Sequence, residues 1–316
     1  MFISKAGNGT LLSIEPARQP IKLNLYRDYE VRALALAIAD SPFLQMAASI
    51  DCVMVSDSYL MTHLGRSSTR VSEGEQPLLL DMMVNLVREV ASEVRRSFDT
   101  HPPFIIADMP DGSTRDKTIA LTSASRMIDA GADVVKIEVC NEAIFDIVSA
   151  LSAQNIRVMT HLGYTPQGGQ SGRVGTTLAE AFTLFKEARN ACDAGADSLV
   201  IEKVDEFVHR ALVDRPESLP SYAIFSGKSA NGGQSLNVWD SVFRPGFEAR
   251  YFPPTASYDV ASYPDIYQVP VIADHLGRLL KLTAMGEFPL SPPSRFKAEE
   301  RRTLQQYNPW LDQEVF

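Results

Sequence analysis

Residues 130–138 read AGADVVKIE, and residues 194–202 repeat the pattern as AGADSLVIE, with six of the nine positions identical. In each copy a helix-like segment stops at a glycine, a short apolar run follows, and the run closes with Glu138 or Glu202. A glycine directly after a helix is a common C-terminal signal, and a short, continuously apolar run is typical of a strand buried on both faces. The repeat therefore predicts a β/α unit that is used more than once.

Short apolar runs of this kind recur along the chain, and most gaps between them hold one helix-length pattern. The runs are Leu34–Ala39, Cys52–Ser56, Phe104–Ala107, Val134–Ile137, Arg157–Thr160, Ser198–Ile201 and Ser221–Phe225, with a weaker eighth near Leu236–Trp239. Strands that alternate with helices imply parallel strands and right-handed crossovers. The pattern favours a (β/α)8 TIM-type barrel. An open doubly wound sheet is the alternative, but no GxGxxG follows the first run to indicate a dinucleotide site.

Several helix starts carry capping signals. Ser41 stands directly before a proline, which suits the first position of a helix. Ser72 with Glu75, and Thr177 with Glu180, have the spacing of a capping box. These signals predict helices that begin near residues 42, 73 and 178.

The length bounds the domain organisation. A barrel of this type needs roughly 250 residues, and the chain has 316. We expect a single barrel domain spanning residues 1–316, with its core at about 27–240. An N-terminal extension precedes that core, and a helical and loop extension at about 241–316 follows it.

Composition excludes several classes of partner. The net charge is −9, and no basic patch indicates nucleic-acid binding. No apolar run approaches the length of a membrane span, and the N-terminus lacks a signal-peptide pattern. The three cysteines, Cys52, Cys140 and Cys192, lack CxxC spacing, which is typical of free thiols in a reducing compartment. We expect a cytoplasmic protein.

Polar residues close six successive strand runs. Active sites of (β/α)8 barrels lie at the C-terminal ends of the strands, so these residues are the candidate site. In chain order they are Ser56-Asp57-Ser58, Asp108, Lys136 with Glu138, His161, Glu202 and Ser226-Gly227-Lys228.

Three of these residues are carboxylates from neighbouring strands. Asp57, Asp108 and Glu138 would repel one another at one barrel mouth unless a cation lay among them. Ligation by oxygen alone suits Mg²⁺ or Mn²⁺. Each acid taken singly could instead cap a helix or pair with a basic side chain. Together they predict a metal site.

The remaining candidates can bind a carboxylate substrate and transfer a proton to or from it. Lys136 lies two residues before Glu138 and faces the same way, so it can fix a substrate carboxylate; a structural salt bridge is the alternative. His161 closes the fifth run. Glu202 lies two strands beyond Glu138, and an unliganded carboxylate near a metal is a natural general base.

These strand ends resemble successive motifs of the ketopantoate hydroxymethyltransferase family, within the phosphoenolpyruvate mutase and isocitrate lyase superfamily. Order and spacing match from about Leu34 to Asp240. The motifs are VSDS at 55–58, ADMP at 107–110, VKIE at 135–138, HLGYTPQ at 161–167 and VIE at 200–202, and GEFP at 286–289 is similar to the C-terminal signature.

The resemblance implies an activity and a role for each residue. The family transfers a one-carbon unit from 5,10-methylenetetrahydrofolate onto 2-oxoisovalerate in pantothenate biosynthesis, and its members are typically homo-oligomers, often decamers. By resemblance, Asp57, Asp108 and Glu138 would bind Mg²⁺, partly through water. Ser58, Asp108, Lys136 and His161 would contact the 2-oxo acid, with Glu202 and Lys136 as catalytic groups.

The chain departs from the family pattern near several strand ends. Ser56 replaces a usual glycine, Asp111 stands where an apolar or aromatic residue is usual, and Lys228 lies in an altered glycine-rich stretch. Asp111 and Lys228 are expected to make the rim of the site more polar. These departures leave open a paralogue acting on another 2-oxo acid. A superfamily lyase for C–C or P–C bonds and a non-catalytic barrel scaffold are the further alternatives.

Overall fold

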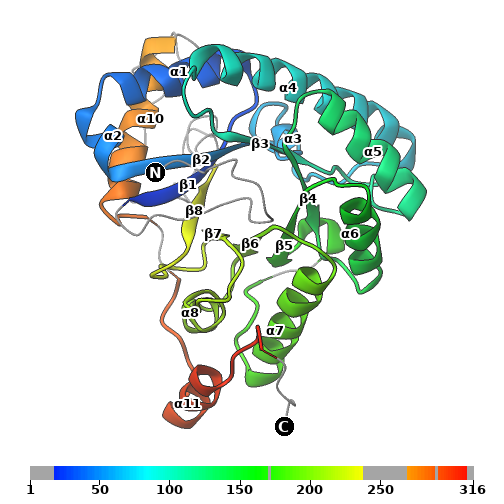
Figure 1. The fold of residues 1–316 in the computed structure, drawn as a ribbon, viewed down its shortest axis with the longest axis vertical. Coiled ribbons are helices and arrows are strands. Elements are labelled where there is room, and N and C mark those ends of the chain that lie inside the picture. The colour runs from blue at the N-terminus through cyan, green and yellow to red at the C-terminus, as the bar shows by residue number, and fades with distance from the viewer. Residues whose placement is uncertain (1–17, 170–171, 238–268, 289–290, 312–316) are drawn as a thin grey trace.

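Eight parallel strands close into a barrel in sequence order, with β1 paired to β8 (Figure 1). The computed structural model describes residues 18–169, 172–237, 269–288 and 291–311. The strands are β1 Gln19–Asn24, β2 Ala48–Val55, β3 Phe104–Asp108, β4 Val134–Glu138, β5 Val158–Gly163, β6 Ser198–Glu202, β7 Ser221–Ile224 and β8 Gly233–Leu236. The predicted (β/α)8 barrel is confirmed.

Helices surround the barrel on its outer face (Figure 1). They are α1 Asp28–Ala39, α2 Pro42–Ala47, α3 Tyr59–Thr62, α4 Gln76–Ser97, α5 Lys117–Asp129, α6 Ala143–Ala153, α7 Leu178–Asp193, α8 Glu206–Val213, α10 Val269–Ala284 and α11 Ala298–Gln306, with short 3₁₀ turns η1 Glu73–Glu75 and η2 Pro166–Gly168. In the described ranges no helix combines the length and the apolar character needed to cross a bilayer.

The first strand is not where the sequence predicted it. The run Leu34–Ala39 is the second half of helix α1, and β1 lies in the stretch assigned to an N-terminal extension. The barrel therefore begins at Gln19 rather than near residue 27. Leucine and alanine are strong helix formers, and a short apolar run does not separate a strand from a buried helix. Strand β1 was missed because Lys22 and Asn24 interrupt its apolar pattern.

The other predicted strands are confirmed to within a few residues. Strand β8 comes earlier than its prediction, because the polar sequence Gly233–Leu236 gave little apolar signal. The far end of that prediction, at Trp239, lies outside the described residues, as does much of the extension predicted at 241–316. Of that extension, α10 packs against α1 and α2, and α11 packs against α8 and α7 (Figure 1).

Local capping fixes the helix starts as predicted. Ser41 Oγ accepts from the Leu44 N–H at 3.3 Å, and the Ser72–Glu75 capping box opens the 3₁₀ turn that leads into α4. Thr177 Oγ1 accepts from the N–H of residue 180, although the Glu180 carboxylate turns to the N–H of residue 176. Gly131, at φ +112°, ends α5 in a backbone region that favours glycine.

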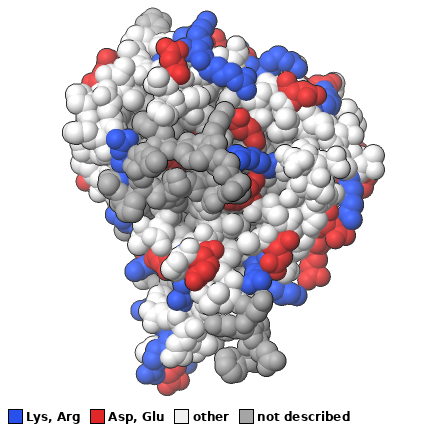
Figure 2. All heavy atoms as spheres, viewed as in Figure 1, with Lys and Arg blue, Asp and Glu red and all other residues white. Residues whose placement is uncertain are grey.

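Apolar side chains fill the interior of the barrel, and polar side chains lie at the carboxyl ends of its strands. Side chains inside the barrel form a buried cluster of Cys52, Met54, Phe104, Ile106, Val134, Met159, Val200 and Tyr222. The polar strand-end residues lie at the carboxyl ends of the same strands. On the surface in Figure 2, acidic and basic side chains are interspersed, and neither sign forms a continuous patch on this face. The fold thus gathers Asp57, Asp108, Lys136 and Glu138 at one end of the barrel.

Candidate active site

A cavity of about 240 Å³ opens at the carboxyl ends of the strands. All seven candidate site residues line it: Asp57, Ser58, Asp108, Lys136, Glu138, His161 and Glu202. Asp57 and Ser58 follow β2, Asp108 closes β3, Lys136 and Glu138 close β4, His161 is in β5, and Glu202 closes β6. The structure therefore brings together the side chains that the strand ends predicted.

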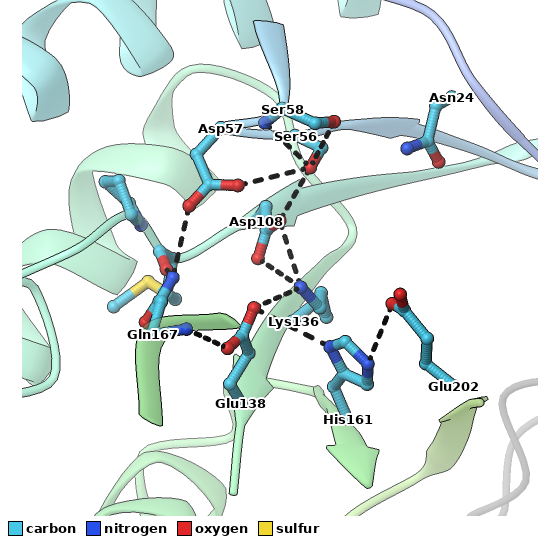
Figure 3. Close-up of polar contacts among 12 residues, drawn as sticks. Asn24, Ser56, Asp57, Ser58, Asp108, Lys136, Glu138, His161, Gln167 and Glu202 are labelled. Carbon is cyan, nitrogen blue, oxygen red and sulfur yellow. Dashed lines mark hydrogen bonds and ion pairs between the residues drawn. The ribbon is translucent and has the colours of Figure 1, made fainter. Parts of the chain in front are cut away.

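Lys136 holds the centre of the cavity (Figure 3). Its Nζ lies 2.9 Å from Asp108 Oδ1, 3.0 Å from Asp108 Oδ2 and 3.6 Å from Glu138 Oε1. Burial acts to lower the pKa of Lys136, but the charges of Asp108 and Glu138 outweigh it and raise the pKa above its ordinary value. Lys136 is therefore a buried ammonium ion.

Gln167, in η2, ties two of the carboxylates together. Its backbone N–H donates to Glu138 Oε2 at 2.8 Å, and its Nε2 donates to Asp57 Oδ2 at 3.2 Å. Ser56 Oγ donates to Asp108 Oδ2 at 2.8 Å. Gln167 ends the HLGYTPQ motif at residues 161–167, but the sequence alone assigned it no role. Its position in a Pro-Gln-Gly turn directly beyond β5 is the signal that could have found it.

The carboxylates carry more negative charge than the lysine balances. Burial first, and then the charge of Asp108, raise the pKa of Asp57 well above its ordinary value. Nevertheless, among the described ranges no group of three or more His, Cys, Asp or Glu side chains is arranged to hold a metal ion. The acids share one cavity, but Lys136 lies between Asp108 and Glu138.

His161 bridges the acidic centre and Glu202 (Figure 3). Its Nδ1 lies 3.7 Å from Glu138 Oε1, and its Nε2 lies 3.3 Å from Glu202 Oε2. Burial and then the charge of Lys136 lower the pKa of His161 to about 3, so the imidazole is neutral at physiological pH.

Glu202 has the protonation behaviour of a base that works near neutral pH. Burial raises its pKa to about 7, against the opposing charges of Lys203 and Lys136. The side chain is 14% exposed and lines the cavity, so it can reach a bound molecule. A carboxylate with this pKa accepts a proton readily and returns it readily.

The sequence reading missed the part of the site that β1 and β8 supply. Asn24 and Asn237 both line the cavity. The Tyr26 hydroxyl lies 2.7 Å from Ser58 Oγ. Asn24 and Tyr26 were overlooked because β1 was not recognised as a strand. Asn237 falls within the predicted eighth run, but that run carried no charged or repeated motif to mark it.

The expected rim residues do not line the cavity. Asp111 turns its carboxylate to the Val71 N–H at 3.1 Å, and Lys228 is exposed. The prediction that these two side chains make the rim more polar is therefore wrong. The polar wall lies instead on β1 and β8.

Comparison with known proteins gives a consistent result. A family model described as ketopantoate hydroxymethyltransferase matches residues 25–254. The 3-methyl-2-oxobutanoate hydroxymethyltransferase of Caldicellulosiruptor bescii is 32% identical over 255 residues, covering 77% of this chain and 85% of the relative. The protein of the same name from Hyperthermus butylicus is 36% identical over 201 residues, covering 61% of this chain and 64% of its own length.

A solved structure adds support for the fold. The crystal structure of a phosphonopyruvate hydrolase complex with oxalate and Mg²⁺ superimposes with a TM-score of 0.50, covering 85% of this chain and 94% of that chain. At 13% sequence identity this likeness concerns the barrel architecture alone.

Proposed function

This chain belongs to the ketopantoate hydroxymethyltransferase family, and on that premise we propose that it catalyses aldol-type transfer of a hydroxymethyl unit onto a 2-oxo acid. The family makes the chain a transferase. The observation that carries the proposal is the pairing, in one cavity, of a buried ammonium ion with an accessible glutamate whose pKa is about 7. A 2-oxo acid needs both: a cation for its carboxylate and a base for its C3 proton.

A divalent ion, Mg²⁺ or Mn²⁺, fits the donor chemistry of the site. The donors are carboxylate oxygens, which Mg²⁺ prefers, and burial together with the charge of Asp108 raises the pKa of Asp57. Asp57, Asp108 and Glu138 would hold the ion, partly through water, because their oxygens also contact Gln167 and Lys136. When bound, the ion would supply Lewis-acid stabilisation of an enolate.

The protein's own side chains would bind and deprotonate the acid. The Lys136 ammonium would pair with the substrate carboxylate, and Ser58 would lie in contact with the bound acid. Glu202 Oε2 would accept the C3 proton. Neutral His161 would lie beside the glutamate, with its Nε2 at 3.3 Å from that oxygen.

The finer assignments extend the same proposal. The one-carbon donor would be 5,10-methylenetetrahydrofolate, and the protein would work in the cytoplasm as a homo-oligomer. The name of the relatives supports the reaction type, and three free cysteines are consistent with a reducing compartment.

Deuterium exchange tests the proposal without a one-carbon donor. Mg²⁺ should promote exchange at C3 of 3-methyl-2-oxobutanoate, followed by NMR in D₂O, and chelation should abolish it. The matched control variant is E142Q, because the Glu142 side chain is 87% exposed and does not line the cavity; it should exchange like the parent. Absence of exchange with a panel of 2-oxo acids, or release of pyruvate or glyoxylate instead, would count against hydroxymethyl transfer.

A further inference from the structure

One wall of the barrel interior is polar where its other walls are apolar. Inward positions of such barrels are usually filled by branched apolar side chains, and the buried cluster contributed by β2 to β7 largely follows that rule. Strand β1 and the end of β8 instead supply Lys22, Asn24, Ser235 and Asn237, all of them buried. Polar groups are costly to bury unless they are hydrogen-bonded. Each of these four therefore needs a partner.

Lys22 fixes the orientation of Asn24. The Lys22 Nζ donates to Asn24 Oδ1 at 3.0 Å and to Ser235 Oγ at 2.7 Å. Burial, and then the charge of Lys136, lower the pKa of Lys22 to about 7, and its Nζ carries hydrogens to donate in both the charged and the neutral form. The Asn24 oxygen faces Lys22, and the amide nitrogen faces the site (Figure 3). That NH₂ group has two hydrogens. One hydrogen can be donated to the Tyr26 hydroxyl, so the second hydrogen can be donated to a ligand.

A directional chain of hydroxyl groups fixes the orientation of Asn237. The Asp108 carboxylate can only accept, so Ser56 Oγ donates to it at 2.8 Å. Ser58 Oγ then donates to Ser56 Oγ at 3.0 Å. Because the hydroxyl hydrogen of Ser58 is used in that bond, Ser58 Oγ can only accept a further hydrogen bond, and it does so from Asn237 Nδ2 at 3.5 Å. The Asn237 Oδ1 therefore faces away from Ser58, and it is a buried atom that receives no hydrogen bond within the described part of the chain.

The donor and the acceptor come from the ends of two paired strands. Lys22 pairs in register with Ser235, and Leu23 pairs with Leu236. Asn24 is the last residue of β1, Asn237 directly follows β8, and both line the cavity. An amide N–H and an unsatisfied carbonyl oxygen at the ends of two paired strands are complementary to one kind of group in particular. A hydroxyl accepts one hydrogen bond and donates another.

We propose that Asn24 and Asn237 bind a hydroxyl group of the acid, so that the acceptor substrate is a hydroxylated 2-oxo acid rather than one with a plain branched alkyl chain. The proposal rests on the proposed function for the 2-oxo acid itself. The hydroxyl belongs to the acid before any one-carbon unit is added. An isopropyl group at this wall would leave Asn237 Oδ1 without a partner, and sites built to bond a hydroxyl discriminate against analogues that lack it.

Two acids that differ by one hydroxyl group test the proposal. Deuterium exchange at C3 is measured for 4-hydroxy-2-oxobutanoate and for 2-oxobutanoate, with Mg²⁺ and no one-carbon donor. The wild-type protein should favour the hydroxylated acid in kcat/KM by about tenfold or more, as expected for one buried hydrogen-bonding site. N237L should bring that ratio close to one. The matched control is N85L, an exposed asparagine on α4, which should keep the wild-type ratio.

Each other outcome is decisive. Equal or faster exchange of 2-oxobutanoate by the wild-type protein overturns the hydroxyl site, as does full preference retained by N237L. If N237L does not fold, the wild-type ratio decides. If neither acid nor 3-methyl-2-oxobutanoate exchanges, the proposed enolisation fails. Calorimetric binding of the same pair to the Mg²⁺-treated protein then decides the hydroxyl site: about tenfold tighter binding of the hydroxylated acid supports it, and equal affinity overturns it.

Discussion

Replacing Glu202 with glutamine should abolish catalysis and stabilise the fold, and the stabilisation should depend on pH. The pKa of Glu202 is about 7 in the folded protein, raised by burial, against 4.5 in an unfolded chain. Below pH 4.5 both states hold the proton. Between pH 4.5 and 7 the unfolded chain loses its proton while the folded protein keeps it, so stability falls as the pH rises through this window.

The size of this effect follows from the shift. A difference of roughly 2.5 pKa units at about 1.36 kcal/mol per unit amounts to about 3 kcal/mol, fully present above pH 7. Glutamine has nearly the same shape and no charge. E202Q should therefore unfold with a free energy about 3 kcal/mol higher than the wild-type protein at pH 8, and less than about 1 kcal/mol higher at pH 5.

Urea denaturation of both proteins in EDTA measures the difference, because chelation removes any cation that would lower the pKa of Glu202. The other titratable groups contribute equally to the free energy of unfolding of both proteins, so their contributions cancel in the difference. The exposed-site variant E142Q should show a difference of no more than a few tenths of a kcal/mol at either pH. In parallel, C3 exchange by E202Q should fall by two or more orders of magnitude. A stability gain that is equal at pH 5 and pH 8, or exchange that survives the substitution, would refute the reasoning.

Of three further predictions, two concern the same end of the barrel and the third concerns the turn that leads into the amino end of β4. K136M should lower the free energy of unfolding by about 3–5 kcal/mol, measured by urea denaturation at pH 7.5, because it leaves the buried Asp108 carboxylate unpaired; unchanged stability would contradict the ion pair. D57N should stabilise the chelated protein, since it removes a carboxylate whose pKa is raised by burial and by the charge of Asp108, and should weaken Mg²⁺ binding in calorimetry; undiminished affinity would remove Asp57 from the metal site. G131A should cost about 1–3 kcal/mol in thermal unfolding, because the residue has φ +112° and a Cβ would meet Ala91 Cβ at 2.8 Å; a wild-type Tm would contradict the need for glycine.

The sequence determined the barrel and most of its active end. The repeated AGAD segments, the apolar runs and the capping residues are local signals, and each acts within a few residues of the structure it specifies. Because all strands of such a barrel run parallel, residues that close successive strands must meet at the same end. Asp57, Asp108, Lys136, Glu138, His161 and Glu202 could therefore be gathered into one site before any coordinates were known, although their order along the chain spans 146 positions.

Only the tertiary structure decided how those groups are charged and what faces them. The raised pKa of Glu202 and the neutral state of His161 come from burial among side chains of other strands. Asn24 and Asn237 line the same cavity because β1 closes the barrel against β8, and β1 was hidden because Lys22 and Asn24 break its apolar pattern. A polar strand at the centre of a fold gives no local signal, since its polarity is tolerated only by partners more than two hundred residues away, such as Ser235 beside Lys22.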